Sequence, residues 1–183
     1  MDGDEEGGRK RRQRRVPKPL DRVALNDLAL HYVARFATSR AKLSTYLKRK
    51  LRERGWDGEG EPDLPALVAK LTEQGFVDDR AFAEAKGASL TRRGFGGRRV
   101  RDALSVAGIA EEDRAGALEA AEAAAWQSAL RFAQRKRIGP YAEEAADRDG
   151  RAKALSAMMR AGHGFELARR IVAAAPGELP TSD

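Results

Sequence analysis

The stretch most suggestive of chemistry is "RRGFGGRRVR" at residues 92–101, where three glycines lie within four positions and five arginines surround them. Such a loop can cradle a phosphate, because free backbone N–H groups and arginines both attract anions. No Gly-Lys-Ser/Thr follows the glycines, so the stretch is not a P-loop. No strand precedes it and the GxGxxG spacing is absent, which excludes a dinucleotide-binding loop. We therefore expect the glycines to form a turn that starts a helix, and treat the arginines separately.

Other groups that could support catalysis are sparse. The chain has no cysteine, so thiol chemistry, disulfides and zinc fingers are excluded. GxSxG and HExxH motifs are absent, and His31 and His163 lie far apart, so we expect both at the surface or at a rim. Asp78 and Asp79 could hold a metal, but a carboxylate at a helix start accepts bonds from free N–H groups. We expect the pair to begin the helix that contains Phe82, and we predict no enzyme, cofactor or metal site.

Charge points to a polyanionic partner. The 183 residues include 35 Lys and Arg against 28 Asp and Glu, for a net charge of +7, and such a surplus favours nucleic acid. The cations gather on particular helical segments, which predicts a basic strip; a merely solvated face is the alternative. The candidate contacts to a partner or to DNA are Lys48, Arg49, Arg52, Arg92, Arg93, Arg98, Arg99 and Arg101.

The two ends of the chain differ in composition from the rest. Residues 1–20 begin with "MDGDEEGG" and continue with "RKRRQRRVPK", which has seven basic residues in ten. Such a segment buries little apolar surface, so we expect a disordered tail that either solubilises the protein or holds phosphates. Residues 176–183 are expected to fray. No apolar run reaches the length of about 18 residues that spans a membrane, and no signal peptide is expected.

The elements that must position the cations are helical. Apolar residues recur at i, i+3, i+4 and i+7 through most of the chain, and no segment alternates as a strand does. A spacing of two apolar residues and a glycine, four apart, occurs three times at offsets of 53 and 54 residues. The three sets are Leu47, Leu51 and Gly55; Val100, Leu104 and Gly108; and Ala154, Met158 and Gly162.

This repeat predicts an all-α fold, an elongated tandem array of about three three-helix units. The expected units are residues 21–77, 78–124 and 125–175. "GFGG" then forms the turn between the first and second helices of its unit. Thr38–Ser39 takes that place in unit one and Arg148–Gly150 in unit three.

The central segment resembles a known family. "GFVDDRAFAEA", the basic "SLTRRGFGGRRVRDAL" and "VAGI" are similar to the central motif of the RecX family, and "ATSRAKLSTYLKRKL" looks like its first-unit helix. The resemblance covers about residues 22–172. The positions that match the motif are Asp78, Asp79, Phe82, Ala83, Gly94, Gly108 and Ile109.

The resemblance implies a bacterial, cytoplasmic regulator of the RecA recombinase, built from three-helix repeats and acting in DNA repair, recombination and the SOS response. Family members bind the recombinase–DNA filament and mostly inhibit it. We expect the RecA filament as partner, weak non-specific DNA binding, a monomer and no membrane partner. A helical module that binds DNA or RNA without any recombinase is the alternative.

Overall fold

The structure, a computed structural model, describes residues 18–181, so most of the predicted basic tail lies outside the described residues. In this range the regular elements are helices, and the only β-type pairing is an isolated bridge between Leu20 and Trp56. The all-α prediction is confirmed. The helices are α1 (Arg22–Arg35), α2 (Arg40–Arg54), α3 (Leu64–Glu73), α4 (Asp79–Arg92), α5 (Gly97–Val106), α6 (Glu111–Ala123), α7 (Ala125–Lys136), the 3₁₀ helix η1 (Gly139–Tyr141), α8 (Arg148–Arg160) and α9 (Phe165–Ala173).

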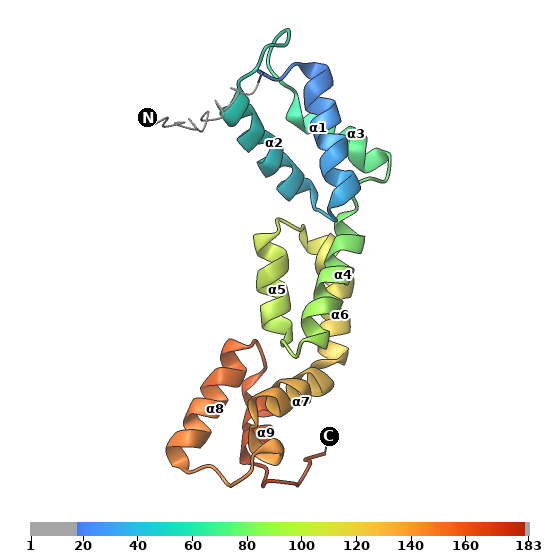
Figure 1. The fold of residues 1–183 in the computed structure, drawn as a ribbon. Coiled ribbons are helices and arrows are strands. Elements are labelled where there is room, and N and C mark those ends of the chain that lie inside the picture. The colour runs from blue at the N-terminus through green and yellow to red at the C-terminus, as the bar shows by residue number, and fades with distance from the viewer. Residues whose placement is uncertain (1–17, 182–183) are drawn as a thin grey trace, which may run out of the picture.

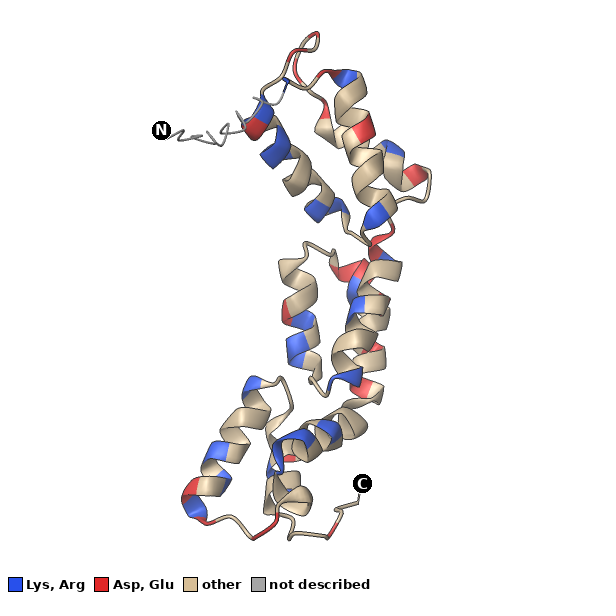
Figure 2. Ribbon diagram, in the orientation of Figure 1, with Lys and Arg blue, Asp and Glu red and all other residues tan. Residues whose placement is uncertain are grey.

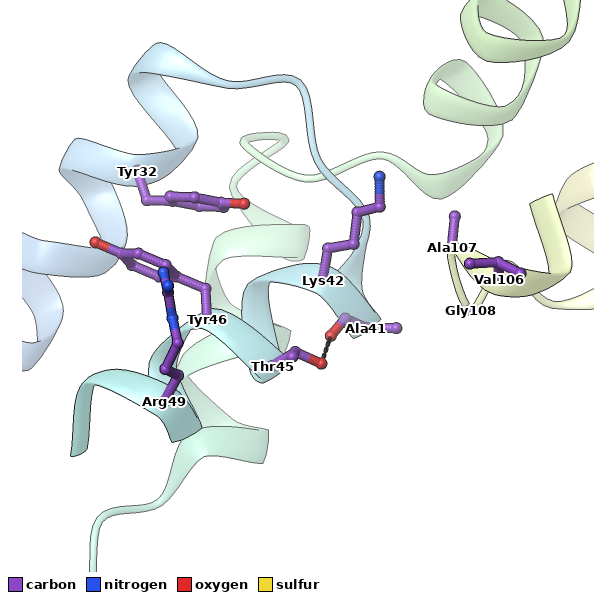
Figure 3. A pocket seen from close by; sticks show the side chains of 9 residues that line it. All are labelled: Tyr32, Ala41, Lys42, Thr45, Tyr46, Arg49, Val106, Ala107 and Gly108. Carbon is purple, nitrogen blue, oxygen red and sulfur yellow. Dashed lines mark hydrogen bonds between the residues drawn. The ribbon is translucent and has the colours of Figure 1, made fainter. Parts of the chain in front are cut away.

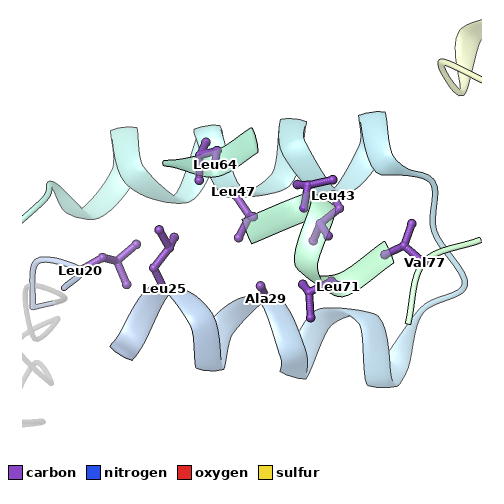
Figure 4. Packing of buried hydrophobic residues seen from close by; sticks show 9 residues of the cluster. Leu20, Leu25, Ala29, Leu43, Leu47, Leu64, Leu71 and Val77 are labelled. Carbon is purple, nitrogen blue, oxygen red and sulfur yellow. The ribbon is translucent and has the colours of Figure 1, made fainter. Parts of the chain in front are cut away.

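Three separate hydrophobic cores organise these helices into an elongated stack of three units (Figure 1). The first core joins α1, α2 and α3 around Leu43 and Leu47, and Figure 4 shows these side chains turned inward between the helices. The second joins α4, α5 and α6, and the third joins α7, α8 and α9. Each helix buries one apolar stripe, as the 3.6-residue period requires.

The second helix of each unit ends where the repeat predicts. α2, α5 and α8 stop beside Gly55, Gly108 and Gly162, whose φ angles are 82°, 70° and 95°. This left-handed region suits glycine because it has no Cβ.

The turn between α4 and α5 contains the "GFGG" glycines and is built for close packing. Gly94 has φ 80°, and a Cβ there would lie 2.9 Å from the backbone nitrogen of Phe132 in α7. A Cβ on Gly96 would lie 2.3 Å from the carbonyl oxygen of Gly162. The structural role expected for these glycines is confirmed, and it includes contact with unit three.

The prediction that Arg148–Gly150 form the corresponding turn in unit three was wrong. Arg148–Gly150 form the first turn of α8, which Asp147 caps by accepting a 2.7 Å hydrogen bond from the Gly150 N–H. The chain instead reverses earlier, through η1 and residues 142–147. Because Asp147 supplies a local cap, the helix forms in spite of its glycine.

The units meet through their second helices. Ser39 at the start of α2 donates from Oγ to the Ala107 carbonyl at the end of α5, at 2.7 Å. Gly96 at the start of α5 donates from its N–H to the Ala161 carbonyl at the end of α8, at 2.9 Å. The start of each second helix thus meets the end of the next, and Figure 1 shows α2, α5 and α8 along one edge of the stack.

Within residues 18–181, no helix is both long and apolar enough to cross a membrane.

Candidate partner and nucleic-acid interface

The cations of α2 point outward because its apolar stripe points inward. Leu43 and Leu47 are fully buried, which leaves Lys48, Arg49 and Arg52 exposed on the outer face. Arg49 approaches Glu53 at 3.8 Å, whereas Lys48 and Arg52 form no ion pair with any other described residue. Exposed pairs such as Arg49–Glu53 contribute little, so these charges remain available to a partner.

On α5 the three predicted arginines have different roles. Arg99 and Arg101 are exposed and make no ion pair within residues 18–181. Arg98 instead donates from Nη2 to the His163 carbonyl at 2.8 Å, and from its backbone N–H to the Gly162 carbonyl at 3.3 Å. Arg98 therefore holds units two and three together.

Arg92, the last residue of α4, and Arg93, which follows it, also have different roles. Arg92 is exposed and makes no ion pair in the described part of the chain. The Arg93 carbonyl accepts a hydrogen bond from the Arg135 guanidinium of α7, and the Arg93 guanidinium lies 5.3 Å from the centre of the Phe95 ring. Arg93 thus contributes to the packing of the α4–α5 turn.

The remaining cations follow the stacked second helices. We call Lys48, Arg49, Arg52, Arg99 and Arg101 the basic strip. Figure 2 shows the basic segments of α2 and α5 along the same edge, with basic segments of α8 continuing them. The end-to-end contacts of these helices bring basic segments of different units to the same edge of the stack.

The acidic pair of the family-like motif separates into two functions. Asp78 caps α4, as expected, by accepting a 2.9 Å hydrogen bond from the Ala81 N–H. Asp79 reaches into unit one, where its Oδ1 accepts from the Arg40 N–H at 2.8 Å and its Oδ2 from the Arg40 Nε at 3.0 Å. Arg40 also donates to Asp113 at 2.6 Å. The bond to Asp79, and then its charge, raise the pKa of Arg40.

The other motif residues lie in the unit-two core or at its ends. Ala83 and Ile109 are buried in that core. Half-buried Phe82 has the Lys42 ammonium of α2 at 4.8 Å from its ring centre. A Cβ on Gly108 would lie 2.4 Å from the Ala41 Cβ, so a side chain there would push unit one away.

The expected position of His163 was wrong, because its side chain is buried with only 1% of the residue exposed. Its Nε2 lies 3.1 Å from the Gly94 carbonyl, and its ring meets Phe132 edge-on at 5.7 Å. Since a carbonyl only accepts, Nε2 carries the proton. Burial lowers the pKa of His163, and the Gly94 carbonyl only partly opposes this. His163 is therefore neutral at neutral pH. Its contact with Gly94 places it at the junction of units two and three.

A groove at the junction of units one and two was not anticipated from the sequence. Tyr32 of α1 and Lys42, Thr45, Tyr46 and Arg49 of α2 form one wall, and Val106 at the end of α5 forms part of the other (Figure 3). Its volume is about 380 Å³. We call this the junction groove. The described residues contain no cluster of three or more His, Cys, Asp or Glu side chains that could hold a metal.

Sequence comparison places this geometry in a family. The chain is 31% identical over 181 residues to the regulatory protein RecX of Myxococcus xanthus, covering 93% of this chain and 97% of that one. It is 35% identical over 163 residues to the regulatory protein RecX of Stenotrophomonas maltophilia (strain R551-3), covering 89% and 90%. The chain belongs to the RecX family. No protein-family model matches it.

Solved RecX structures share the fold. The crystal structure of RecX from Lactobacillus salivarius superposes with a TM-score of 0.59 over 82% of this chain and 93% of that one, at 18% identity. A second RecX crystal structure gives a TM-score of 0.58 at 21% identity, covering 81% of this chain and 70% of the other. The all-helical architecture is thus that of RecX proteins, as the central motif suggested.

Proposed function

We propose that this protein binds RecA recombinase filaments in the cytoplasm, as a monomer, and mostly inhibits their recombinase and ATPase activity without chemistry of its own. The observation that carries the proposal is the basic strip on end-to-end second helices. A recombinase–DNA filament offers a long groove with acidic protein and phosphate, and a row of cations on an elongated stack complements such a groove. The relatives' name, regulatory protein RecX, supports a regulatory role.

The test reverses charge on the strip without disturbing its junctions. The variant Arg99→Glu/Arg101→Glu keeps Arg98, whose bonds hold unit three. Lys70→Glu/Lys86→Glu is the matched control, because it makes the same charge change at exposed positions of α3 and α4. Charged contacts that become desolvated at an interface cost about 2–5 kcal/mol each when truncated, and exposed ones well under about 1 kcal/mol.

The measurements are the recombinase's DNA-dependent ATPase and co-sedimentation with recombinase-coated single-stranded DNA. We expect wild type and the control variant to inhibit, and the strip variant to lose at least about tenfold in affinity. An unchanged ATPase with wild type would remove the regulator proposal. Equal inhibition by wild type and the strip variant would support the recombinase as partner and show that the contact does not involve Arg99 and Arg101 of α5.

A helical module that binds only nucleic acid is the second candidate, because Lys48, Arg52, Arg92, Arg99 and Arg101 are exposed and unpaired among the described residues. Such binding falls steeply with salt, since each neutralised phosphate releases counterions. Under this alternative the protein would bind bare DNA as tightly as coated DNA. Under our proposal it binds bare DNA weakly and the filament more tightly at the same salt concentration.

A further inference from the structure

The junction groove is positively charged and its lining contains no acid. Lys42 and Arg49 contribute the two cations, and Tyr32 adds a hydroxyl that Figure 3 shows turned toward Lys42. Within the described residues Lys42 makes no ion pair, and the one ion pair of Arg49 is the exposed contact with Glu53 at 3.8 Å. The groove therefore complements an anion.

The aromatic rings of the groove do not offer free faces. Tyr32 and Tyr46 stack on each other with centroids 4.0 Å apart and planes 16° apart. Arg49 lies 5.6 Å from the Tyr46 centroid and Phe36 lies 5.4 Å from that of Tyr32. Stacking on an aromatic face is how most single-stranded nucleic-acid sites bind bases. The rings here are already engaged, so the groove lacks that mode of binding.

The rim of the groove is apolar where the repeat otherwise places charge. Val106 is 89% exposed at the end of α5. The residues at the corresponding repeat positions are Glu53 in α2 and Arg160 in α8. Phe36, next to Tyr32, is a second exposed apolar residue, 53% accessible. An exposed aliphatic side chain contributes to binding by burying against another apolar group, and a phosphodiester offers none.

From these three features we infer that the junction groove binds an acidic segment of a protein partner, with a carboxylate at Lys42 and Arg49 and a neighbouring apolar side chain on Val106. The inference rests on the proposed function and makes it more specific, because the partner's protein surface, not its DNA, occupies this groove. DNA phosphates remain the complement of the basic strip outside it.

The experiment changes Val106, which is too exposed for its replacement to disturb folding. Val106→Gln removes the apolar contact. Val106→Glu introduces a side chain of nearly the same size as Gln that also carries a negative charge. Val23→Gln and Val23→Glu are matched controls, because Val23 is 69% exposed on α1 and lies outside the groove. All four variants are expected to keep the wild-type melting temperature. Their affinities are measured for RecA-coated poly(dT) and for bare poly(dT) at one salt concentration.

We expect Val106→Gln to weaken binding to coated poly(dT) about fivefold and Val106→Glu a further fivefold or so. On bare poly(dT), each Val106 variant should match its Val23 counterpart. A Val106→Gln variant that binds the coated filament as wild type does would overturn the inference. So would a Val106→Glu variant that loses equally on bare and coated poly(dT), since the occupant would then be a phosphodiester. If wild type itself binds both equally, the proposed function fails and the inference with it.

Discussion

Replacing Asp79 tests whether the motif's acidic pair separates into a cap and an inter-unit clamp. Asp79→Ala removes both bonds to Arg40, at 2.8 and 3.0 Å, and leaves the first-turn N–H of α2 without its acceptor. Asp78→Ala is the matched control, because it removes a carboxylate from the adjacent position that bonds only within α4.

The magnitudes follow from burial. The Asp79 side chain is 3% exposed, so losing the acceptor of the Arg40 N–H costs about 1–2 kcal/mol. The Arg40 side chain is 45% exposed, so water screens the ion pair and its share is below about 1 kcal/mol. We therefore expect Asp79→Ala to lower the free energy of unfolding by about 2 kcal/mol, and Asp78→Ala by about 1 kcal/mol for a lost N-cap.

The assay is urea unfolding of the two single variants, of Arg40→Ala, and of each aspartate change combined with it. Arg40 and Asp79 should couple by about 0.5–1 kcal/mol, and Arg40 and Asp78 not at all. Because the units have separate cores, weakening their junction should also broaden the transition of Asp79→Ala. Zero coupling between Arg40 and Asp79, together with equal losses in the two single variants, would refute the clamp.

Two further predictions concern the junction of units two and three. Gly96→Ala should cost about 2 kcal/mol or more in urea unfolding, because its Cβ would lie 2.3 Å from the Gly162 carbonyl, whereas Gly97→Ala, with its nearest atom at 3.6 Å, should not destabilise the protein. Burial holds the pKa of His163 below its ordinary value of 6.5, so the unfolded chain binds more protons. The contribution of neutral His163 to the free energy of unfolding is complete above about pH 6.5 and is lost as the pH falls below that value. The free energy of unfolding of His163→Gln should therefore fall less than that of wild type between pH 7.5 and 5.5. An equal loss in His163→Gln would assign the pH dependence to other groups.

The features that the sequence predicted are local ones. A helix with a 3.6-residue stripe and a glycine stop is encoded within about fifteen residues, so the ends of α2, α5 and α8 at Gly55, Gly108 and Gly162 could be placed without a structure. The N-cap of α4 by Asp78 could also be predicted from nearby residues, because its partner Ala81 is three residues away.

What could not be predicted depends on contacts distant in sequence. Asp79 meets Arg40 39 residues earlier, and His163 meets Gly94 69 residues earlier. A histidine between two glycines is typical of an exposed turn, and nothing nearby indicates that another unit covers it. For the same reason Arg98 was grouped with Arg99 and Arg101, although only Arg98 donates to unit three. The sequence identifies the basic helices, and only the junctions decide which cations stay free.

The two junctions differ in how they are made, and this bears on how the basic strip works. Units two and three are joined by backbone bonds such as Gly96 N–H to the Ala161 carbonyl, at glycines that leave no room for a Cβ. Between the described parts of units one and two no backbone–backbone hydrogen bond is present; side chains of Ser39, Arg40 and Asp79 make the contact. Ser39 is fully buried and the Asp79 side chain is 3% exposed, and a Cβ on Gly108 would lie 2.4 Å from the Ala41 Cβ, so this junction is closely packed as well. The junction groove lies at this side-chain contact, between α2 and the end of α5. A partner segment bound there would contact the basic helices of both units.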